Sequence, residues 1–235
     1  NINDTTAPVV TGTLTASNTD GCSIAAAPSA MTTVTALETA GLTISDNCTA
    51  DANLVVTSSD GTATGTCPIT FIRTYTVKDA CNNATTVTQI ININDTTAPV
   101  VTGTLTTVNE TGCSITDASI AMTSVSQLEA AGLTISDNCT TDANLVVTSS
   151  DGTATGTCPI TFTRTYTITD ACNNTTNAIQ TINIIDATAP IVTGILPQLA
   201  ISGCSITSVP VAMTSVSQLE AAGLTISDNC TTDAN

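Results

Sequence analysis

The sequence contains no His and no Trp, and Lys and Arg together account for only 3 of its 235 residues. Without His, the usual general base near neutral pH and the commonest transition-metal ligand are both missing. The three cations, Arg73, Lys78 and Arg164, form no basic surface that would neutralise phosphates, so we expect no nucleic-acid partner. Ser and Thr are abundant, but no His and no suitably placed Lys accompanies them, so we expect no enzyme.

Charge and long apolar runs are scarce as well. Charged residues make up 9% of the chain, against about 25% in an ordinary soluble domain. No stretch approaches the roughly 18 apolar residues of a membrane-spanning helix, so we expect no membrane insertion in this segment. The chain has instead Thr, at about a fifth of its residues, together with Val and Ile. These residues favour strands, and the composition predicts an all-β fold.

Ten Cys recur in a regular pattern with a period of 91 residues. The recurring positions are Cys22, Cys48, Cys67 and Cys81, then Cys113, Cys139, Cys158 and Cys172, then Cys204 and Cys230. Such a period predicts an array of like modules, each long enough to fold as a domain. The expected divisions are the tail of a preceding module (1–3), repeat 1 (4–94), repeat 2 (95–185) and an incomplete repeat 3 (186–235). We interpret the chain as a segment of a longer array of such modules.

Within a repeat, alternation of apolar and polar residues predicts short strands, bounded by turn signals such as Asp60-Gly61. The strands expected in repeat 1 are 8–14, 42–45, 54–59, 69–77 and 86–93. About seven short strands in all predict tandem immunoglobulin-like antiparallel β-sandwich modules. One short helix is expected in each, with Thr35 to Glu38 as a capping box and Gly41 ending the helix.

Arg73 and Arg164 fall on the apolar face of the strand 69–77 and of its counterpart in repeat 2. We favour a long side chain that packs its stem and reaches the edge of the sandwich. A buried ion pair with a loop Asp is the alternative.

The cysteines favour disulfides in an oxidising, extracellular setting, because no C-x2-C or C-x4-C spacing typical of thiolate–metal sites occurs. Cys67 and Cys81 flank a strand that spans about 46 Å when fully extended, whereas a disulfide needs Cα atoms about 4.4–6.8 Å apart. This pair is therefore excluded unless the strand folds back. Two connectivities then remain within a repeat. We favour the one that joins the Asp-Asn-Cys and Asp-Ala-Cys loops, which an immunoglobulin topology places at one end. The predicted pairs are Cys22–Cys67, Cys48–Cys81, Cys113–Cys158 and Cys139–Cys172.

Two motifs carry a resemblance to a known family. The run Tyr-Thr-x-x-Asp-Ala-Cys-Asn-Asn (75–83 and 166–174), followed by a strand and Asn-Asp-Thr-Thr-Ala-Pro (94–99), resembles HYR-like immunoglobulin-type repeats. Those repeats occur in giant surface adhesins of Bacteroidetes, including the SprB-type gliding-motility adhesins. The resemblance implies export by the type IX secretion system and a place at the cell surface. The family typically shows Asp-Ala-Cys-Gly-Asn, and Asn82 and Asn173 stand here where that Gly is usual.

Acidic residues recur at equivalent positions of the repeats, in the loops expected at one end of each module. The linker Asn-Asp-x-x-Ala-Pro also resembles that of cadherins, where Ca2+ stiffens the joint. Hard oxygen ligands on loops suit Ca2+. The candidate Ca2+ ligands are Asp4, Asp46, Asp79, Asn94, Asp95, Asp137, Asp142 and Asp170. The alternative, which the sequence alone favours, is that these side chains only form Asx turns and N-caps.

The sequence-based hypothesis for function is a stalk or filament segment of a large secreted adhesin, whose rigid, disulfide-stapled repeats give reach and display. The partners expected are neighbouring repeats of the same chain and, in a filament, other copies. The alternative is that each module is itself a glycan- or protein-binding domain. The Bacteroidetes resemblance also implies O-glycosylation at Asp-Thr-Thr, which marks Thr5 and Thr96.

Overall fold

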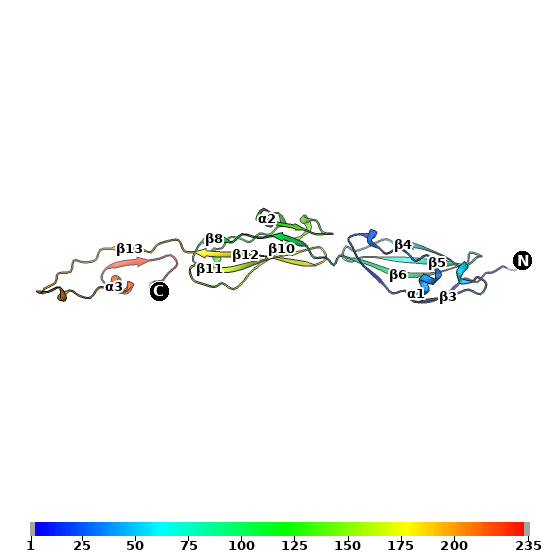
Figure 1. Cartoon of the computed structure of the whole chain (residues 1–235), viewed down its shortest axis with the longest axis horizontal. Coiled ribbons are helices and arrows are strands. Elements are labelled where there is room, and N and C mark those ends of the chain that lie inside the picture. Colours follow the sequence, from blue (N-terminus) through cyan, green and yellow to red (C-terminus); the bar gives the residue numbers. More distant parts are fainter. Residues whose placement is uncertain (1–2, 233–235) are drawn as a thin grey trace. The chain divides into compact units, whose positions relative to one another are not determined.

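The structure, a computed structural model, describes residues 3–232. The fold is all-β, as the composition predicts, with three short α-helices in that range (Figure 1). Of the expected tail of a preceding module (1–3), residues 1 and 2 lie outside the described residues, as do 233–235 of repeat 3. No helix among the described residues is long and apolar enough to cross a membrane.

Corresponding elements begin 91 positions apart in the three repeats. Repeat 1 contains β1 (Val9–Gly12), β2 (Ser17–Asp20), η1 (Ile24–Ala26), α1 (Val34–Thr39), β3 (Leu42–Ser45), η2 (Asp51–Asn53), β4 (Val55–Asp60), β5 (Ile69–Lys78) and β6 (Ala84–Asn94). Repeat 2 contains β7 (Val100–Gly103), β8 (Val108–Thr111), η3 (Ile115–Asp117), α2 (Val125–Ala130), β9 (Leu133–Ser136), η4 (Asp142–Asn144), β10 (Val146–Asp151), β11 (Ile160–Thr169) and β12 (Thr175–Ile185). Repeat 3 contains β13 (Ile191–Gly194), η5 (Ile206–Ser208), α3 (Val216–Ala221) and β14 (Leu224–Ser227).

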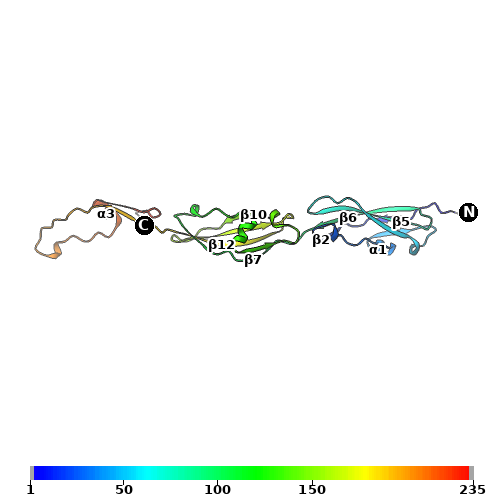
Figure 2. The ribbon, with the colours of Figure 1, turned by 90° about the horizontal axis from the view of Figure 1, so that it is seen from above.

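The strands of repeat 1 form two sheets, one of β1 and β3 and one in the order β2-β6-β5-β4. The long strands β5 and β6 run side by side over ten paired positions, from Ile69↔Ile93 to Lys78↔Ala84 (Figure 2). Six strands form where about seven were expected, and β2 pairs with β6 in parallel. The sequence did not predict β2, because its Ser, Asn, Thr and Asp carry no apolar alternation. Repeat 2 has the same orders, β7-β9 and β8-β12-β11-β10.

The core of repeat 1 lies between α1 with the small sheet and the large sheet. Leu37 from α1 and Ile44 from β3 pack in one cluster with Tyr75 and Val77 from β5. All four are at most 3% exposed. A second cluster, Phe71 with Ile91 and Ile93, fills the other half of the large sheet. The apolar face predicted for 69–77 is therefore the buried one.

Helix α1 begins two residues earlier than a capping box at Thr35 requires. Thr33 is the N-cap, and its side chain accepts the N–H of Ala36 at 3.2 Å. Glu38 lies near the end of the helix and accepts the N–H of Ile44 at 3.3 Å, so it ties β3 to the helix instead of capping the N-terminus. Gly41 ends the helix as predicted, since its φ of +112° belongs to a region that side chains disfavour.

Arg73 is buried and forms an ion pair with Asp60, the last residue of β4, whose own side chain is 45% exposed. The arrangement therefore combines features of both sequence-based interpretations. Its guanidinium donates to both carboxylate oxygens of Asp60, at 2.6 and 2.9 Å, and to the carbonyl of Pro28 at 2.6 Å. Arg73 is only 5% exposed, so its charge depends on these acceptors. Arg164 repeats the arrangement with Asp151 and the carbonyl of Ser119.

The described residues fall into two compact units, and the boundary between them runs inside repeat 2. The first unit comprises the residues up to Gly103 with Thr123–Thr148 and Thr167–Asn177. The second comprises Thr104–Met122, Ser149–Tyr166 and Ala178 onward. In the second unit, Phe162, Ile182 and Ile184 form a buried cluster. The apolar residues of repeat 3 are mostly exposed, and α3 buries none of its residues.

Candidate metal centre

Three carboxylates of the first unit converge, each placed directly after the end of a strand. Asp95 follows β6, Asp137 follows β9 and Asp170 follows β11. One oxygen of each lies within 4.8 Å of one oxygen of each other. Asp95 and Asp170 are buried, at 2% and 3% exposure. We call these three residues the joint triad.

Backbone N–H groups fix the orientation of each carboxylate in the joint triad. Asp137 Oδ2 accepts the N–H of Cys139 at 3.0 Å and of Thr140 at 2.7 Å. Asp170 Oδ1 accepts from the N–H groups of Cys172 and Asn174. These are the Asx turns that the alternative interpretation predicts, so they do not by themselves require a metal ion.

Two carboxylate oxygens of the joint triad are buried without a hydrogen-bond donor among the described residues. Asp95 Oδ1 accepts the N–H of Thr97 and the side-chain amide of Asn138, but Asp95 Oδ2 is buried and has no hydrogen-bond donor among the described residues. Asp137 Oδ1 is buried and unpartnered in the same way. A buried carboxylate oxygen without a donor is costly, so these two atoms mark the place where a cation would fit.

Electrostatics points the same way. Two unit charges about 4.8 Å apart repel by roughly 3–4 kcal/mol at an effective dielectric constant near 20, and the joint triad contains three such pairs. The chain carries a formal charge of −16, and no Lys or Arg forms a salt bridge with the triad among the described residues. A divalent cation with oxygen ligands removes this repulsion, and Ca2+ accepts such carboxylate sets.

Repeat 1 carries an equivalent cluster of Asp4, Asp46 and Asp79. Asp46 and Asp79 accept the backbone N–H groups that correspond to those on Asp137 and Asp170, and Asp4 Oδ2 and Asp46 Oδ1 are the unpartnered atoms. Burial raises the pKa of Asp79, but donors from Asn83, Cys81 and Asn82 outweigh it, so the net pKa lies below its ordinary value. Asp79 is therefore anionic at neutral pH.

The turn after the third carboxylate of each cluster contains a non-Gly residue in the left-handed region. Asn82 and Asn173 have φ values of +70° and +68°, in the left-handed region that Gly enters most readily. Asn is among the few other residues that tolerate this region. Asn82 and Asn173 thus allow this turn without a Gly.

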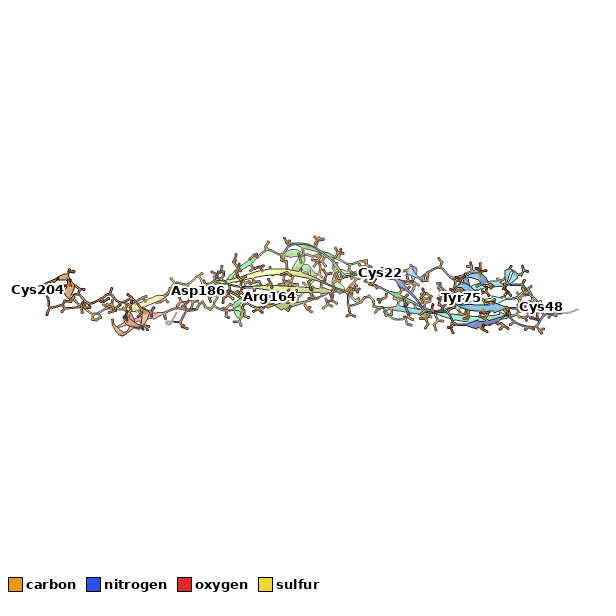
Figure 3. All side chains as sticks on the ribbon, turned by 60° about the horizontal axis from the view of Figure 1, so that its bottom comes forward. Cys22, Cys48, Tyr75, Arg164, Asp186 and Cys204 are labelled. Atoms are coloured by element: carbon orange, nitrogen blue, oxygen red, sulfur yellow. A yellow bond between two sulfur atoms is a disulfide. The ribbon has the colours of Figure 1, made fainter. Side chains whose placement is uncertain are left out.

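The predicted disulfides within a repeat are wrong. The structure joins Cys22 to Cys139, Cys67 to Cys172 and Cys113 to Cys230, with Cα atoms 4.9–5.4 Å apart. Cys48, Cys81, Cys158 and Cys204 are free. In repeat 1, Cys22 and Cys48 lie at opposite ends, with Tyr75 between them (Figure 3). All three bonds join cysteines of consecutive repeats, a pairing that the sequence-based prediction does not include.

The remaining predicted site residues are scattered. Asp142 is the first residue of η4, is exposed to solvent and is not a member of the joint triad. Asn94 Oδ1 lies 3.2 Å from Cys67 Sγ. Thr5 and Thr96 are both exposed, and the hydroxyl of Thr96 donates to Asp20 at 2.8 Å.

No protein-family model and no curated protein matches the chain. Among solved structures, similar chains include the crystal structure of the protocadherin gammaB4 extracellular domain (12% identity, TM-score 0.32, 83% of this chain and 36% of that chain). Another is the protocadherin gammaB7 EC3-6 cis-dimer structure (10% identity, TM-score 0.32, 83% of this chain and 54% of that chain). A third is the crystal structure of human mucin-like protocadherin EC1-2 (9% identity, TM-score 0.29, 76% of this chain and 99% of that chain). The matches thus span about a third and about half of the first two chains.

Proposed function

We propose that this chain is a structural segment of a secreted cell-surface adhesin, in which Ca2+ and disulfides fasten one repeat to the next. One observation carries the proposal. The joint triad, with two orphaned buried oxygens, lies among residues that two disulfides connect to repeat 1. A disulfide and a bound cation at the same joint would hold neighbouring repeats together under mechanical load, as a structural segment requires.

The finer assignment rests on the sequence motifs. The Asp-Ala-Cys-Asn-Asn runs support an HYR-like, SprB-type adhesin of Bacteroidetes, exported by the type IX system and used in gliding motility. The division into repeats at 4–94, 95–185 and 186–235 belongs to the same proposal. Its partners are then the neighbouring repeats and, in a filament, other copies of the chain.

The proposed Ca2+ ligands are the joint triad and its equivalent Asp4, Asp46 and Asp79. A ligand that binds only the folded state at a hundred times its Kd stabilises by about 2.7 kcal/mol. We therefore expect a calorimetric melt of the whole chain to shift upward with Ca2+ and back with chelator. Asp142→Asn is the matched control, since this exposed carboxylate lies outside both clusters, and it leaves the shift intact. Equal melting temperatures with Ca2+ and with chelator would rule out the calcium fastening.

The adhesive alternative needs a different readout. A glycan- or protein-binding module retains cells or polysaccharide on an immobilised chain, whereas a stalk segment does not. We expect no retention, with or without Ca2+. Retention that requires the folded chain would replace the stalk with a binding module.

A further inference from the structure

The disulfides and the joint triad share the same two loops. Asp137 is followed two residues later by Cys139, whose N–H donates to its carboxylate at 3.0 Å. Asp170 is followed in the same way by Cys172, at 2.8 Å. Because Cys139 is bonded to Cys22 and Cys172 to Cys67, each of these backbone donors is covalently tied to repeat 1.

A cavity of about 240 Å³ brings the two features together. Its wall includes Asp95 and three of the four bonded cysteines, Cys22, Cys139 and Cys172. Asp95 is 2% exposed, and its Oδ2 has no donor among the described residues. A cation that reaches this buried oxygen therefore lies next to the disulfides that hold the other two carboxylates.

We propose that cation binding at the joint triad and the disulfides Cys22–Cys139 and Cys67–Cys172 are coupled, so that each stabilises the other. The inference rests on the proposed function, because it requires a divalent cation at the triad. The disulfides hold the carboxylates together against their repulsion, and the cation removes the repulsion that drives the loops apart. Coupling between two binding equilibria is reciprocal, so the effect is measurable from either side.

The same chain supplies two internal controls. Cys113–Cys230 joins the same kinds of cysteine over the same separation of 117 residues as Cys22–Cys139. Near it, Asp186 and Asp228 form no three-carboxylate group with another described residue. Conversely, Asp4, Asp46 and Asp79 form a triad whose neighbouring Cys48 and Cys81 are free. The joint triad thus has both carboxylates and neighbouring disulfides, the first control has a disulfide without a triad, and the second has a triad without disulfides.

The first experiment places the whole chain in a redox buffer of reduced and oxidised dithiothreitol. Each protein disulfide takes two electrons and two protons from the dithiol, which becomes its cyclic disulfide, and two cysteine thiols form. Alkylation and mass spectrometry then give the equilibrium fraction of every disulfide. We expect Ca2+ to lower the equilibrium constant for reducing Cys22–Cys139 and Cys67–Cys172 by about fivefold or more, with Cys113–Cys230 unchanged. An equal response of all three disulfides would overturn the coupling.

Variants separate this inference from the function on which it rests. Asp95→Asn is expected to abolish the Ca2+ effect on the two joint disulfides, and Asp142→Asn to leave it intact. The equilibrium of Cys113–Cys230 in the same sample shows whether the second unit has kept its fold. In the reverse direction, the double variant Cys22→Ser, Cys67→Ser loses Ca2+ affinity at the joint triad and keeps it at Asp4, Asp46 and Asp79.

Two different failures are distinguishable. If Ca2+ does not bind the chain at all, the proposed function fails and the coupling with it. If Ca2+ binds in an Asp95-dependent way but shifts no disulfide equilibrium, only the coupling fails.

Discussion

Cys22 is bonded to Cys139, 117 residues further along the chain, and not to a cysteine of its own repeat. Digestion of the non-reduced protein with an Asp-specific protease tests this, since only three basic residues offer cuts to trypsin. We expect linked peptides containing Cys22 with Cys139 and Cys67 with Cys172. Peptides linking Cys22 to Cys67 would contradict the structure.

Removal of the Cys22–Cys139 bond by Cys22→Ser is expected to lower the stability of the first unit by about 2–5 kcal/mol, because the unfolded chain regains the freedom of a long loop. Hydrogen exchange of β5 and β6 measures it. Cys48→Ser changes a cysteine that is already free and serves as the matched control. A Cys48→Ser effect as large as that of Cys22→Ser would mean that Cys48 is bonded in solution.

The ion pair of Arg73 and Asp60 is expected to contribute measurably to stability. Asp60→Asn removes the charged acceptor from a guanidinium that is only 5% exposed, so we expect a loss of about 1.5–3 kcal/mol in urea unfolding. Asp51→Asn, at an exposed position of η2, is the control and is expected to change little. Equal effects of the two variants would show that the pair adds no specific stability.

The same ion pairs predict a pH dependence. Hydrogen bonds from Arg73 and Arg164 hold the pKa values of Asp60 and Asp151 below their ordinary range. A lowered pKa in the folded state gives stability that is fully present above the unfolded-state pKa of about 3.9. That stability is lost as the pH falls through the folded-state values. Melting temperatures between about pH 6 and pH 3 should fall less steeply in Asp60→Asn, Asp151→Asn than in the wild type. Parallel curves would refute this assignment.

An identical sequence stretch offers a test of core burial. Met122–Asn144 and Met213–Asn235 have the same residues, yet Leu128 is 0% exposed while Leu219 is only half-buried. Leu128→Ala is expected to cost about 2–5 kcal/mol, and Leu219→Ala well under half of that. Thermal unfolding of the two variants measures the difference. Equal losses would mean that repeat 3 also forms a closed core.

Much of the fold was predictable from local pattern. The alternation in 69–77 and the Gly after the helix specify β5 and the end of α1, because both depend on residues close in sequence. The parallel strand β2 was not predictable, since its pairing with β6 involves residues 74 positions apart and its own side chains are polar.

The candidate site was predictable in part, and its disulfides were not. Asp95, Asp137 and Asp170 were expected close together because each lies in a loop at the same end of a module, but Asp142 was expected with them and belongs to neither cluster. Disulfide partners depend on which loops face each other across the joint. Each complete repeat contains four cysteines, an even number that favours disulfides within the repeat. No local sequence feature distinguishes Cys67 from Cys139 as the partner of Cys22.

A calorimetric Ca2+ titration of the intact, oxidised chain tests the central claim most directly. The two triads found among residues 3–232 predict two bound ions, reduced to one by Asp95→Asn and unchanged by Asp142→Asn. Absence of Ca2+ binding, or an Asp95→Asn chain that still binds two ions, would contradict a cation site at the joint triad.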